Sequence, residues 1–531
     1  MVSLANSQTL DTGKNVPKST PEADIEANQP PESKIKNKGA YHPDDLKDLP
    51  PDGGVEAWTA AACSLLYCFA SWGSVSSYAV FLNFYLTSDI LPGITKIDYA
   101  LVAGLTMCLL LCCSFVVSGL LVIWNVKVVA TIGLVLHFVG MLLASFSVNY
   151  WQMILTEGIL SGLGCGILFA IAVILVPSWF LKRRTIASGL QFAGTGLGGC
   201  VFSLVSQAMI ERTGNQRWAL RTIAFIALFL NVIATALVKL RKPLHIKAVK
   251  DNNQGQFKTF IRAMRVPLQP KVWFTSTALM LVGYFCISSI GYVIILYSLS
   301  NFAVSVGLSA KQGSDALAIL NACQFIGRLS IGIIGDKIGR FNISMLMSYT
   351  VIIFTFAFWI PITTYAQVIA FSAMMGLVMG YQFVTISPII ADFFGVKNFP
   401  VVWCLISFVN SIVGLVSELI ALGLKRSDSA EKPYLYAQIF TGVMFAVSSF
   451  FLLPLRELKI SNIIRQWKNE AEEELVNTAN TNFSDDKDKT ESDNGKDLQF
   501  RIEDHRINQY NDLLATTPSA YLKRVFYPIA A

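Results

Sequence analysis

Residues 321–340 read NACQFIGRLSIGIIGDKIGR, and this stretch decides the class of fold. It places Arg328 in the middle of a segment that is otherwise apolar enough to cross a membrane. A charged side chain at that depth costs about 2.5–3.5 kcal/mol on insertion scales, so it needs a partner or a water-filled cavity. On a helix, Asn321 and Gln324 share one face with Arg328. This face is a candidate substrate-binding surface; the alternative is that Arg328 forms a structural ion pair or extends to the nearer membrane surface.

Composition and the recurrence of apolar segments indicate a membrane protein. Of the 531 residues, 53% are hydrophobic and only 15% are charged, which excludes an ordinary soluble domain. Apolar segments of about 20 residues, long enough to span a hydrocarbon core, recur from Trp58 onwards. They begin near residues 58, 99, 128, 150, 185, 218, 272, 315, 343, 366, 400 and 434. The sequence therefore predicts an all-α membrane protein with twelve transmembrane helices in two six-helix halves.

Charged segments divide the chain and orient it. Residues 1–52 are rich in proline and charge, contain no signal peptide, and predict a disordered cytoplasmic tail. The two halves, 53–238 and 272–456, are separated by residues 239–271, which are strongly basic and contain a single acid, Asp251. Because basic loops stay on the cytoplasmic side, we expect this loop and both termini in the cytoplasm.

The C-terminal tail, residues 457–531, is expected to lie outside the membrane. Ile460, Ile464 and Trp467 recur at helical spacing among basic residues, which predicts a short amphipathic helix on the inner membrane surface. Beyond Glu470 the composition is acidic and polar and is typical of disorder.

A glycine-rich motif follows the eighth apolar segment. It consists of Gly332, Asp336, Lys337, Gly339 and Arg340, at the spacing that the major facilitator superfamily uses in one of its cytoplasmic loops, and it resembles that motif. The glycines allow two helix ends to approach closely, and the aspartate can pair with a base or cap a helix N-terminus. We therefore predict that these residues gate one side of the protein; the alternative is an ordinary charged turn.

Two further segments resemble the signatures of one branch of that superfamily. Asp52 opens the run DGGVEAW before the first apolar segment, and Lys182 and Arg183 lie in the run WFLKRRTIASGLQFAG before the fifth. Together these runs are similar to the monocarboxylate-transporter family, and most of all to its fungal branch. The resemblance implies a carrier that moves a small organic solute by alternating between two orientations.

The same resemblance marks two departures. Animal lactate carriers have an arginine at the position of Arg328, but an acid where Gln324 stands and a lysine at or beside Ser76. Both of the family's coupling groups are therefore replaced. A carboxylate can still form a bidentate pair with Arg328. The other residues predicted to line the site are Asn321, Tyr78 and Tyr284, with Trp72 and Tyr292 on the same helices; each could equally be a packing residue.

Three other titratable groups lie within the apolar segments and are candidates for proton coupling. They are Glu157 in the fourth, Glu418 in the eleventh and His137 in the third. The two glutamates could instead be helix-end carboxylates near the outer surface, and His137 could be a neutral histidine bonded to a neighbouring helix.

The sequence contains no HxxxH or CxxC pattern and no nucleophile–base pairing that would indicate a metal site or an enzyme. We expect no cofactor and no nucleic-acid partner; the expected partners are the lipid bilayer, a solute and protons, and no ancillary subunit can be identified. The predicted function is secondary active transport of a small carboxylate-bearing or anionic solute, proton-coupled, in the plasma membrane rather than a vacuolar one. Alternatives are a carrier of a vitamin such as riboflavin, which the fungal branch includes, and a transporter-like nutrient sensor.

Overall fold

A computed structural model describes residues 50–88, 96–241, 261–262, 264–424, 432–484, 493–525 and 527. Most of the predicted N-terminal tail and of the basic central loop lies outside these residues. Within them the chain forms helices joined by short turns and contains no strand. Because a lipid environment offers no hydrogen-bond partners, helices that satisfy their own backbone groups are the expected solution for apolar segments of this length.

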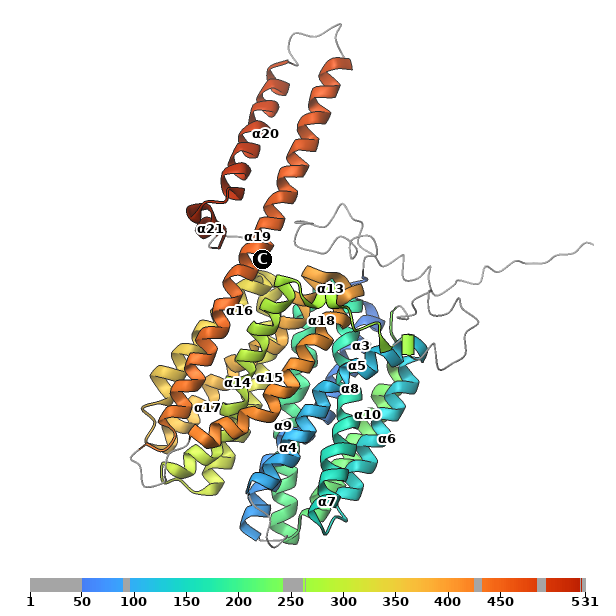
Figure 1. The fold of residues 1–531 in the computed structure, drawn as a ribbon, viewed down its shortest axis with the longest axis vertical. Coiled ribbons are helices and arrows are strands. Elements are labelled where there is room, and N and C mark those ends of the chain that lie inside the picture. Colours follow the sequence, from blue (N-terminus) through green and yellow to red (C-terminus); the bar gives the residue numbers. More distant parts are fainter. Residues whose placement is uncertain are drawn as a thin grey trace, which may run out of the picture.

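The first six spans run back and forth through the bundle (Figure 1). They are formed by α3 (Gly54–Ser88), α4 (Lys96–Cys112) with α5 (Ser114–Ile123), α6 (Val126–Ala144), α7 (Tyr150–Met153) with η3 (Ile154–Ser161) and α8 (Gly162–Trp179), α9 (Arg184–Thr213) and α10 (Gln216–Leu237). Asparagine side chains cap the first turns of α6 and α10, where Asn125 and Asn215 accept bonds from backbone N–H groups.

The last six spans form the second half of the bundle. After the short α13 (Pro270–Trp273) come α14 (Ser276–Ser305), α15 (Ala310–Ile338), α16 (Arg340–Ile353) with η4 (Phe354–Trp359), α17 (Tyr365–Met379), α18 (Tyr381–Leu424) and α19 (Leu435–Ser484). Ser309 and Gln312 form a capping box that starts α15.

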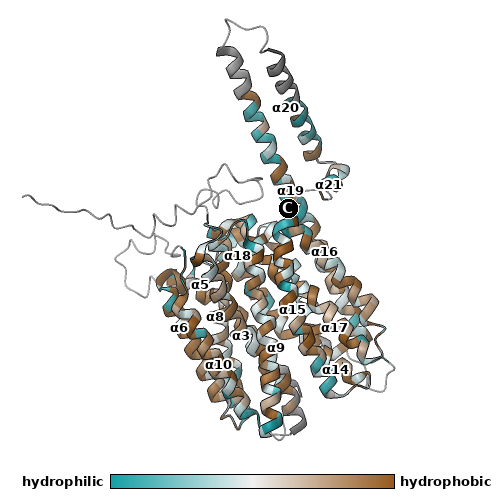
Figure 2. Ribbon diagram, turned by 180° about the vertical axis from the view of Figure 1, so that it is seen from behind, coloured by the Kyte–Doolittle hydropathy of each residue, from teal (hydrophilic) through white to brown (hydrophobic). Residues whose placement is uncertain are grey.

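Within the described residues twelve spans can be traced, as the sequence predicts. Eleven helical stretches are long and apolar enough to cross a membrane, and one of them, Tyr365–Ser417, covers 53 residues. Within it Gly395 has φ 70° and ψ 166°, a conformation that breaks a helix and that glycine adopts at little cost. The stretch therefore holds the tenth and the eleventh span. Figure 2 shows that hydrophobic residues dominate the helices of the bundle, whereas the helices that project from one end carry more hydrophilic ones.

The C-terminal region differs from its prediction. Ile460, Ile463 and Ile464 do not form a separate helix; they continue α19, which extends beyond the bundle at what we call the tail end (Figure 1). There they are fully buried against side chains of α20 (Asp493–Leu514), such as Tyr510. The segment was expected to be disordered because its composition is acidic, yet its few apolar residues fall on one face and pair with those isoleucines. The short α21 (Pro518–Val525) then closes against α19.

Candidate functional site

Arg328 lies on α15 deep inside the bundle, with only 2% of its surface exposed. One terminal nitrogen donates to the carbonyl oxygen of Phe192 at 2.8 Å and to the hydroxyl of Thr195, both on α9. The other donates to Gln324 Oε1 at 2.5 Å and to the Tyr292 hydroxyl at 3.1 Å. The guanidinium thus bridges the two halves of the bundle, because α9 belongs to the first half and α14 and α15 to the second.

All of these partners are neutral. Among the residues that the structure describes, Arg328 has no carboxylate within ion-pair distance, and its Nε atom has no hydrogen-bond partner. A buried charge is normally retained only when it is paired, because removing it from water costs several kcal/mol. The described residues therefore do not place Arg328 in a structural ion pair, which was the first alternative. The second alternative does not hold either, because a guanidinium that is 2% exposed does not extend to the membrane surface.

Aromatic rings enclose the guanidinium. The ring of Phe383, on α18, lies 5.7 Å from the Arg328 guanidinium carbon. Trp72 and Phe192 from the first half pack on Phe383 with ring centroids 5.7 and 5.8 Å away, and Tyr292 packs on it at 4.9 Å. The site is closed in this conformation: the space between these side chains is too small for a water molecule.

Close packing of helices brings two other predicted polar residues, Ser76 and Asn321, together at Gly199. A side-chain carbon at Gly199 of α9 would lie 3.1 Å from Ser76 and 3.5 Å from Asn321, and one at Gly196 would lie 2.9 Å from the Asn321 carbonyl. The glycines therefore let α3, α9 and α15 approach one another closely. Ser76 and Asn321 therefore both lie against Gly199, and Asn321 is two helical turns from Arg328 along α15.

Tyr284 and Tyr78 lie elsewhere. The Tyr284 hydroxyl is 3.4 Å from Thr385 Oγ1 within the second half, whereas Tyr292 on the same helix reaches Arg328. Tyr78 donates to the carbonyl of Tyr99 at 3.0 Å and lines a separate cavity in the first half.

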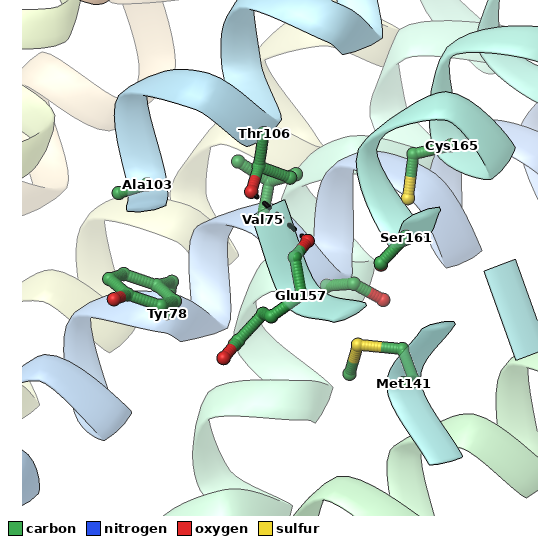
Figure 3. A pocket seen from close by; sticks show the side chains of 9 residues that line it. Val75, Tyr78, Ala103, Thr106, Met141, Glu157, Ser161 and Cys165 are labelled. Carbon is green, nitrogen blue, oxygen red and sulfur yellow. Dashed lines mark hydrogen bonds between the residues drawn. The ribbon is translucent and has the colours of Figure 1, made fainter. Parts of the chain in front are cut away.

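That cavity surrounds Glu157, which lies in the π-helical turn η3 of the fourth span (Figure 3). It has a volume of about 20 Å³, room for one water molecule. Polar side chains from α3, α4 and η3 line it, among them Tyr78, Thr106 and Ser161. Glu157 is buried, and its Oε2 atom has no hydrogen-bond partner among the described residues. The carboxylate is therefore an interior group and not a helix end at the membrane surface.

The two remaining proton candidates are less informative. Glu418 falls on α18, at a position whose side chain lies outside the described residues. His137 is buried on α6 where α8 packs tightly against it, and Gly164 faces its backbone. Neither is among the residues that surround Arg328 or that line the Glu157 cavity.

The glycine-rich motif closes the tail end of the bundle by capping a helix of the other half. Asp336 accepts hydrogen bonds from the backbone N–H groups of Thr185 and Ile186, at 3.0 and 2.8 Å, in the first turn of α9. Asp52 caps the same region from the first half, accepting from the N–H groups of residues 181, 182 and 183. Carboxylates suit this position because unpaired N–H groups and the helix dipole both favour negative charge. Lys182 and Arg183 thus contribute through their backbone.

A buried ion-pair cluster lies next to these caps. Asp392 of α18 pairs with Arg340, and its Oδ1 atom is 3.7 Å from Arg184 Nη1 of the first half. Arg340 also donates to the Leu181 carbonyl at 2.6 Å. We call Asp336, Arg340, Asp392 and Arg184 the latch. Gly332 belongs to the contact because a side chain there would meet the Thr185 carbonyl at 2.9 Å; Gly339, at φ 100°, makes the turn, and Lys337 is exposed.

Sequence comparison decides the family. Residues 60–417 match the sequence profile of the Major Facilitator Superfamily. The chain belongs to this superfamily. It is 33% identical over 482 residues to the uncharacterised transporter ESBP6 of Saccharomyces cerevisiae, a match that covers 91% of this chain and 70% of that one. It is 32% identical over 395 residues to the probable transporter MCH2 of the same yeast, which covers 74% of this chain and 81% of the relative.

Other relatives and a solved structure agree with this placement. The fujikurins efflux protein of Gibberella fujikuroi is 28% identical over 411 residues, with 77% of this chain and 84% of the relative covered. The crystal structure of the superfamily transporter FucP matches with a TM-score of 0.53 at 15% identity, over 74% of this chain and 97% of that one, and so shares the fold. The chain is therefore a multi-pass membrane transporter of the facilitator type and not an enzyme.

Several residues of this facilitator's site could not be singled out from the sequence. Phe383 and Thr195 contact Arg328 only because spans ten and five both pack against span eight in the folded bundle. Asp392 did carry a signal, since it is an acid next to an apolar run in the tenth span. No such signal marks Arg184 in the sequence, because it stands in a run of three basic residues that begins at Lys182.

Proposed function

We propose that this facilitator is a secondary active transporter of a small organic anion that carries a carboxylate, and that Arg328 binds the carboxylate. One observation carries the proposal: a guanidinium that is 2% exposed has only neutral partners among the described residues. The missing counter-charge is what an anionic substrate would supply. A planar guanidinium holds a carboxylate through two parallel bonds, and its charge persists at any physiological pH.

The location of Arg328 supports transport rather than static binding. It donates to α9 in one half and lies on α15 in the other, so a substrate bound there would sit between the two halves. In secondary transporters such a site opens alternately to each side as the halves rock about it. The latch at the tail end supplies contacts that one of these movements must break, since Asp336 and Arg340 bond directly to the backbone of the first half.

Glu157 is the group that we propose for proton coupling. It is a buried carboxylate whose cavity admits one water, and no basic side chain lines that cavity. An unpaired carboxylate is costly to bury as an anion, so it can follow the protein's conformation by taking up and releasing a proton. α3 runs past both places, with Tyr78 at the Glu157 cavity and Trp72 at the Arg328 site, which offers a physical link between them.

The test is transport by the purified protein in proteoliposomes. Uptake of labelled lactate, pyruvate, acetate and riboflavin would be measured with and without an inward proton gradient, for the wild type and for Arg328→Gln. We expect gradient-stimulated uptake of a carboxylate that falls at least about 100-fold in the variant, the scale of losing a charged hydrogen-bonded contact. Arg221→Gln is the matched control, because Arg221 is stacked between Phe146 and Trp218, away from the site.

Two results would contradict the proposal. Equal carboxylate uptake by wild type and Arg328→Gln would remove Arg328 from the substrate site. Binding of a carboxylate without any accumulation, under every gradient, would favour the sensor alternative.

For the coupling role, Glu157→Gln should transport with a rate that no longer depends on the proton gradient; an unchanged dependence would exclude Glu157. Because one relative is named an efflux protein, export from loaded vesicles would be measured as well.

The orientation and the membrane are part of the same proposal. Basic residues such as Lys182 and Arg183 gather at the tail end, so we assign this end to the cytoplasm. We further propose the plasma membrane, where a carrier of external solutes or of exported products would act. Protease protection of a tag on the C-terminus in sealed cells tests the orientation, and cleavage of that tag from outside would reverse it.

A further inference from the structure

The last helix of the chain, α21, carries large apolar side chains that are exposed. Tyr521 is 37% exposed and its neighbour Leu522 is 55% exposed. Among the tail residues whose side chains the structure describes, Val476 is the one other large apolar residue with comparable exposure. Lys523 is exposed beside them, and residues 513–531 contain no acid. This end of the chain is therefore apolar and basic on a surface that the described residues leave open.

The opposite side of α21 is held by the protein. Ala520 and Arg524 are buried there. The Arg524 side chain donates to Glu457 of α19 at 2.6 Å and to the carbonyl of Ala515 at 3.0 Å. Leu522 lies two positions from Ala520 and two from Arg524, which is a rotation of about 200° on an α-helix. Leu522 therefore faces away from α19, and the bonds of Arg524 fix the helix in this orientation.

Contacts with α19 place α21 where the last span ends. Residues 435–455 of α19 contain no charged residue and are long enough to cross a hydrocarbon core of about 30 Å. Arg456 follows directly. Its guanidinium donates to the carbonyl of Arg524 at 3.4 Å and to the carbonyl of Tyr527 at 2.9 Å, at and just beyond the last turn of α21. The C-terminal end of α21 therefore lies at the level of the lipid headgroups at the tail end.

A second span fixes the same level. Arg456 Nε donates to Asn342 Oδ1 at 3.0 Å, and Asn342 lies in the first turn of α16. Figure 1 and Figure 2, which view the protein from opposite sides, both show α21 beside the point where α19 leaves the bundle, near α16. Arg456 and Asn342 belong to spans twelve and nine, so α21 is attached to the second half. Its exposed face therefore borders the region that lipid occupies around this half.

The exposed face has the composition of a helix that lies in a membrane surface. Tyrosine is enriched at the boundary between lipid and water, leucine enters the acyl region, and lysine is attracted to anionic headgroups. We propose that α21 lies on the leaflet at the tail end, with Tyr521 and Leu522 below the headgroups and Lys523 on anionic lipid. α21 then takes the place that the sequence predicted for residues 460–467, whose isoleucines are buried against α20 instead.

The first measurement is the environment of position 522 in the full-length protein in lipid nanodiscs. An environment-sensitive fluorescent amino acid replaces Leu522 by codon suppression. In the control protein it replaces Val476, which is 54% exposed but lies about 30 Å further along α19 than Arg456, at 1.5 Å per residue. Phosphatidylcholine brominated in its acyl chains then quenches any fluorophore that touches these chains. We expect blue-shifted, quenched emission at position 522 and neither effect at position 476.

The second measurement separates the charge from the apolar contact. Hydrogen–deuterium exchange of α21 is compared in nanodiscs of phosphatidylcholine and of equal parts phosphatidylcholine and phosphatidylserine. One lysine at an anionic surface should slow exchange about fivefold in the second lipid. Lys523→Glu should abolish this difference, and Lys523→Gln should leave a smaller one. Leu522→Ser should raise exchange in both lipids. Lys432→Glu is the control, because Lys432 is an exposed lysine at the other end of the last span.

Three outcomes would overturn the proposal. Emission at position 522 that matches position 476 would mean that α21 faces water. Blue-shifted emission without quenching would mean that protein covers this face, as a second copy of the chain could. Exchange of α21 that does not respond to phosphatidylserine, or that changes in Lys432→Glu as much as in Lys523→Glu, would remove the contact with anionic lipid. In every variant residues 460–464 must keep their wild-type exchange, which shows that the tail has stayed folded against α20.

Discussion

Two buried arginines, Arg328 within α15 and Arg340 just after its end, differ in how their charges are balanced. Arg340, at the start of α16, is 6% exposed, pairs with Asp392 and shares that carboxylate with Arg184. Arg328 is buried even more deeply, yet its hydrogen-bond partners among the described residues are two hydroxyls, an amide and a carbonyl. The positive charge of Arg340 at the tail end is thus balanced by a carboxylate of the protein itself. The positive charge of Arg328 at the centre of the bundle has only neutral partners among the described residues.

The difference separates two uses of buried charge. A pair within the protein is strongest in the conformation that assembles it, so the latch favours the state in which the tail end is closed. An unpaired guanidinium costs free energy in that state, and the cost is relieved when an anion arrives. On the proposed function, one arginine therefore stabilises a conformation and the other creates affinity for a ligand.

The largest expected effect comes from breaking the pair at the tail end. Asp392→Asn removes the carboxylate that Arg340 and Arg184 share, and loss of one partner of a buried pair costs about 3–5 kcal/mol. We expect the melting temperature in detergent to fall sharply. Arg328→Gln removes a charge that has no partner, so its melting temperature should stay the same or rise. Unfolding followed by intrinsic tryptophan fluorescence would measure both.

The exposed residue Asp512 provides the control for this comparison, and Asp512→Asn should leave the melting temperature unchanged. If Asp392→Asn and Arg328→Gln destabilise the protein equally, the two arginines have the same structural role and the contrast between them is wrong.

The contacts of Arg328 also show which parts of the site can be predicted from the sequence. Twelve apolar segments predicted the fold, and helical spacing predicted that Gln324 lies beside Arg328, because both depend on local periodicity. Thr195 and Phe383 could not be predicted, since each reaches Arg328 from a different span and only helix packing decides which faces meet.

The tail shows the opposite limit. Its acidic composition predicted disorder, but an ion pair between Arg524 and Glu457, at 2.6 Å and largely buried, fixes α21 to α19. Such a contact joins residues that are far apart in sequence, so the composition of the segment does not reveal it. The isoleucines that were predicted to face lipid are buried, but they pack against α20 and not against the membrane.

A second prediction converts the unpaired arginine into a paired one. Gln324 Oε1 lies 2.5 Å from Arg328, so Gln324→Glu places a carboxylate where the amide is. We expect a higher melting temperature and, at neutral pH, at least about tenfold weaker binding of a carboxylate probe such as benzoate, because the new charge competes for the guanidinium. Lowering the pH until this carboxyl binds a proton should restore the affinity, since the neutral acid no longer competes.

Gln324→Met is the matched variant for this measurement, as it removes the hydrogen bond without adding charge. Its affinity for the probe should show no recovery on acidification beyond that of the wild type. Benzoate binding by Gln324→Glu that equals the wild type at every pH would mean that the anion does not use the guanidinium.

The smallest expected effect concerns the two carboxylates that cap α9 from different halves. Asp336→Asn and Asp52→Asn each replace a charged acceptor of backbone N–H groups by a neutral one, which we expect to cost about 1–2 kcal/mol. Hydrogen–deuterium exchange should therefore rise in the first turn of α9 in Asp336→Asn, and at residues 181–183, just before that turn, in Asp52→Asn. Only Asp336→Asn also loosens a contact between the halves, so only this variant should raise exchange at the end of α15. Faster exchange there in Asp52→Asn would show that the caps act as one unit, and the latch would then have to include Asp52.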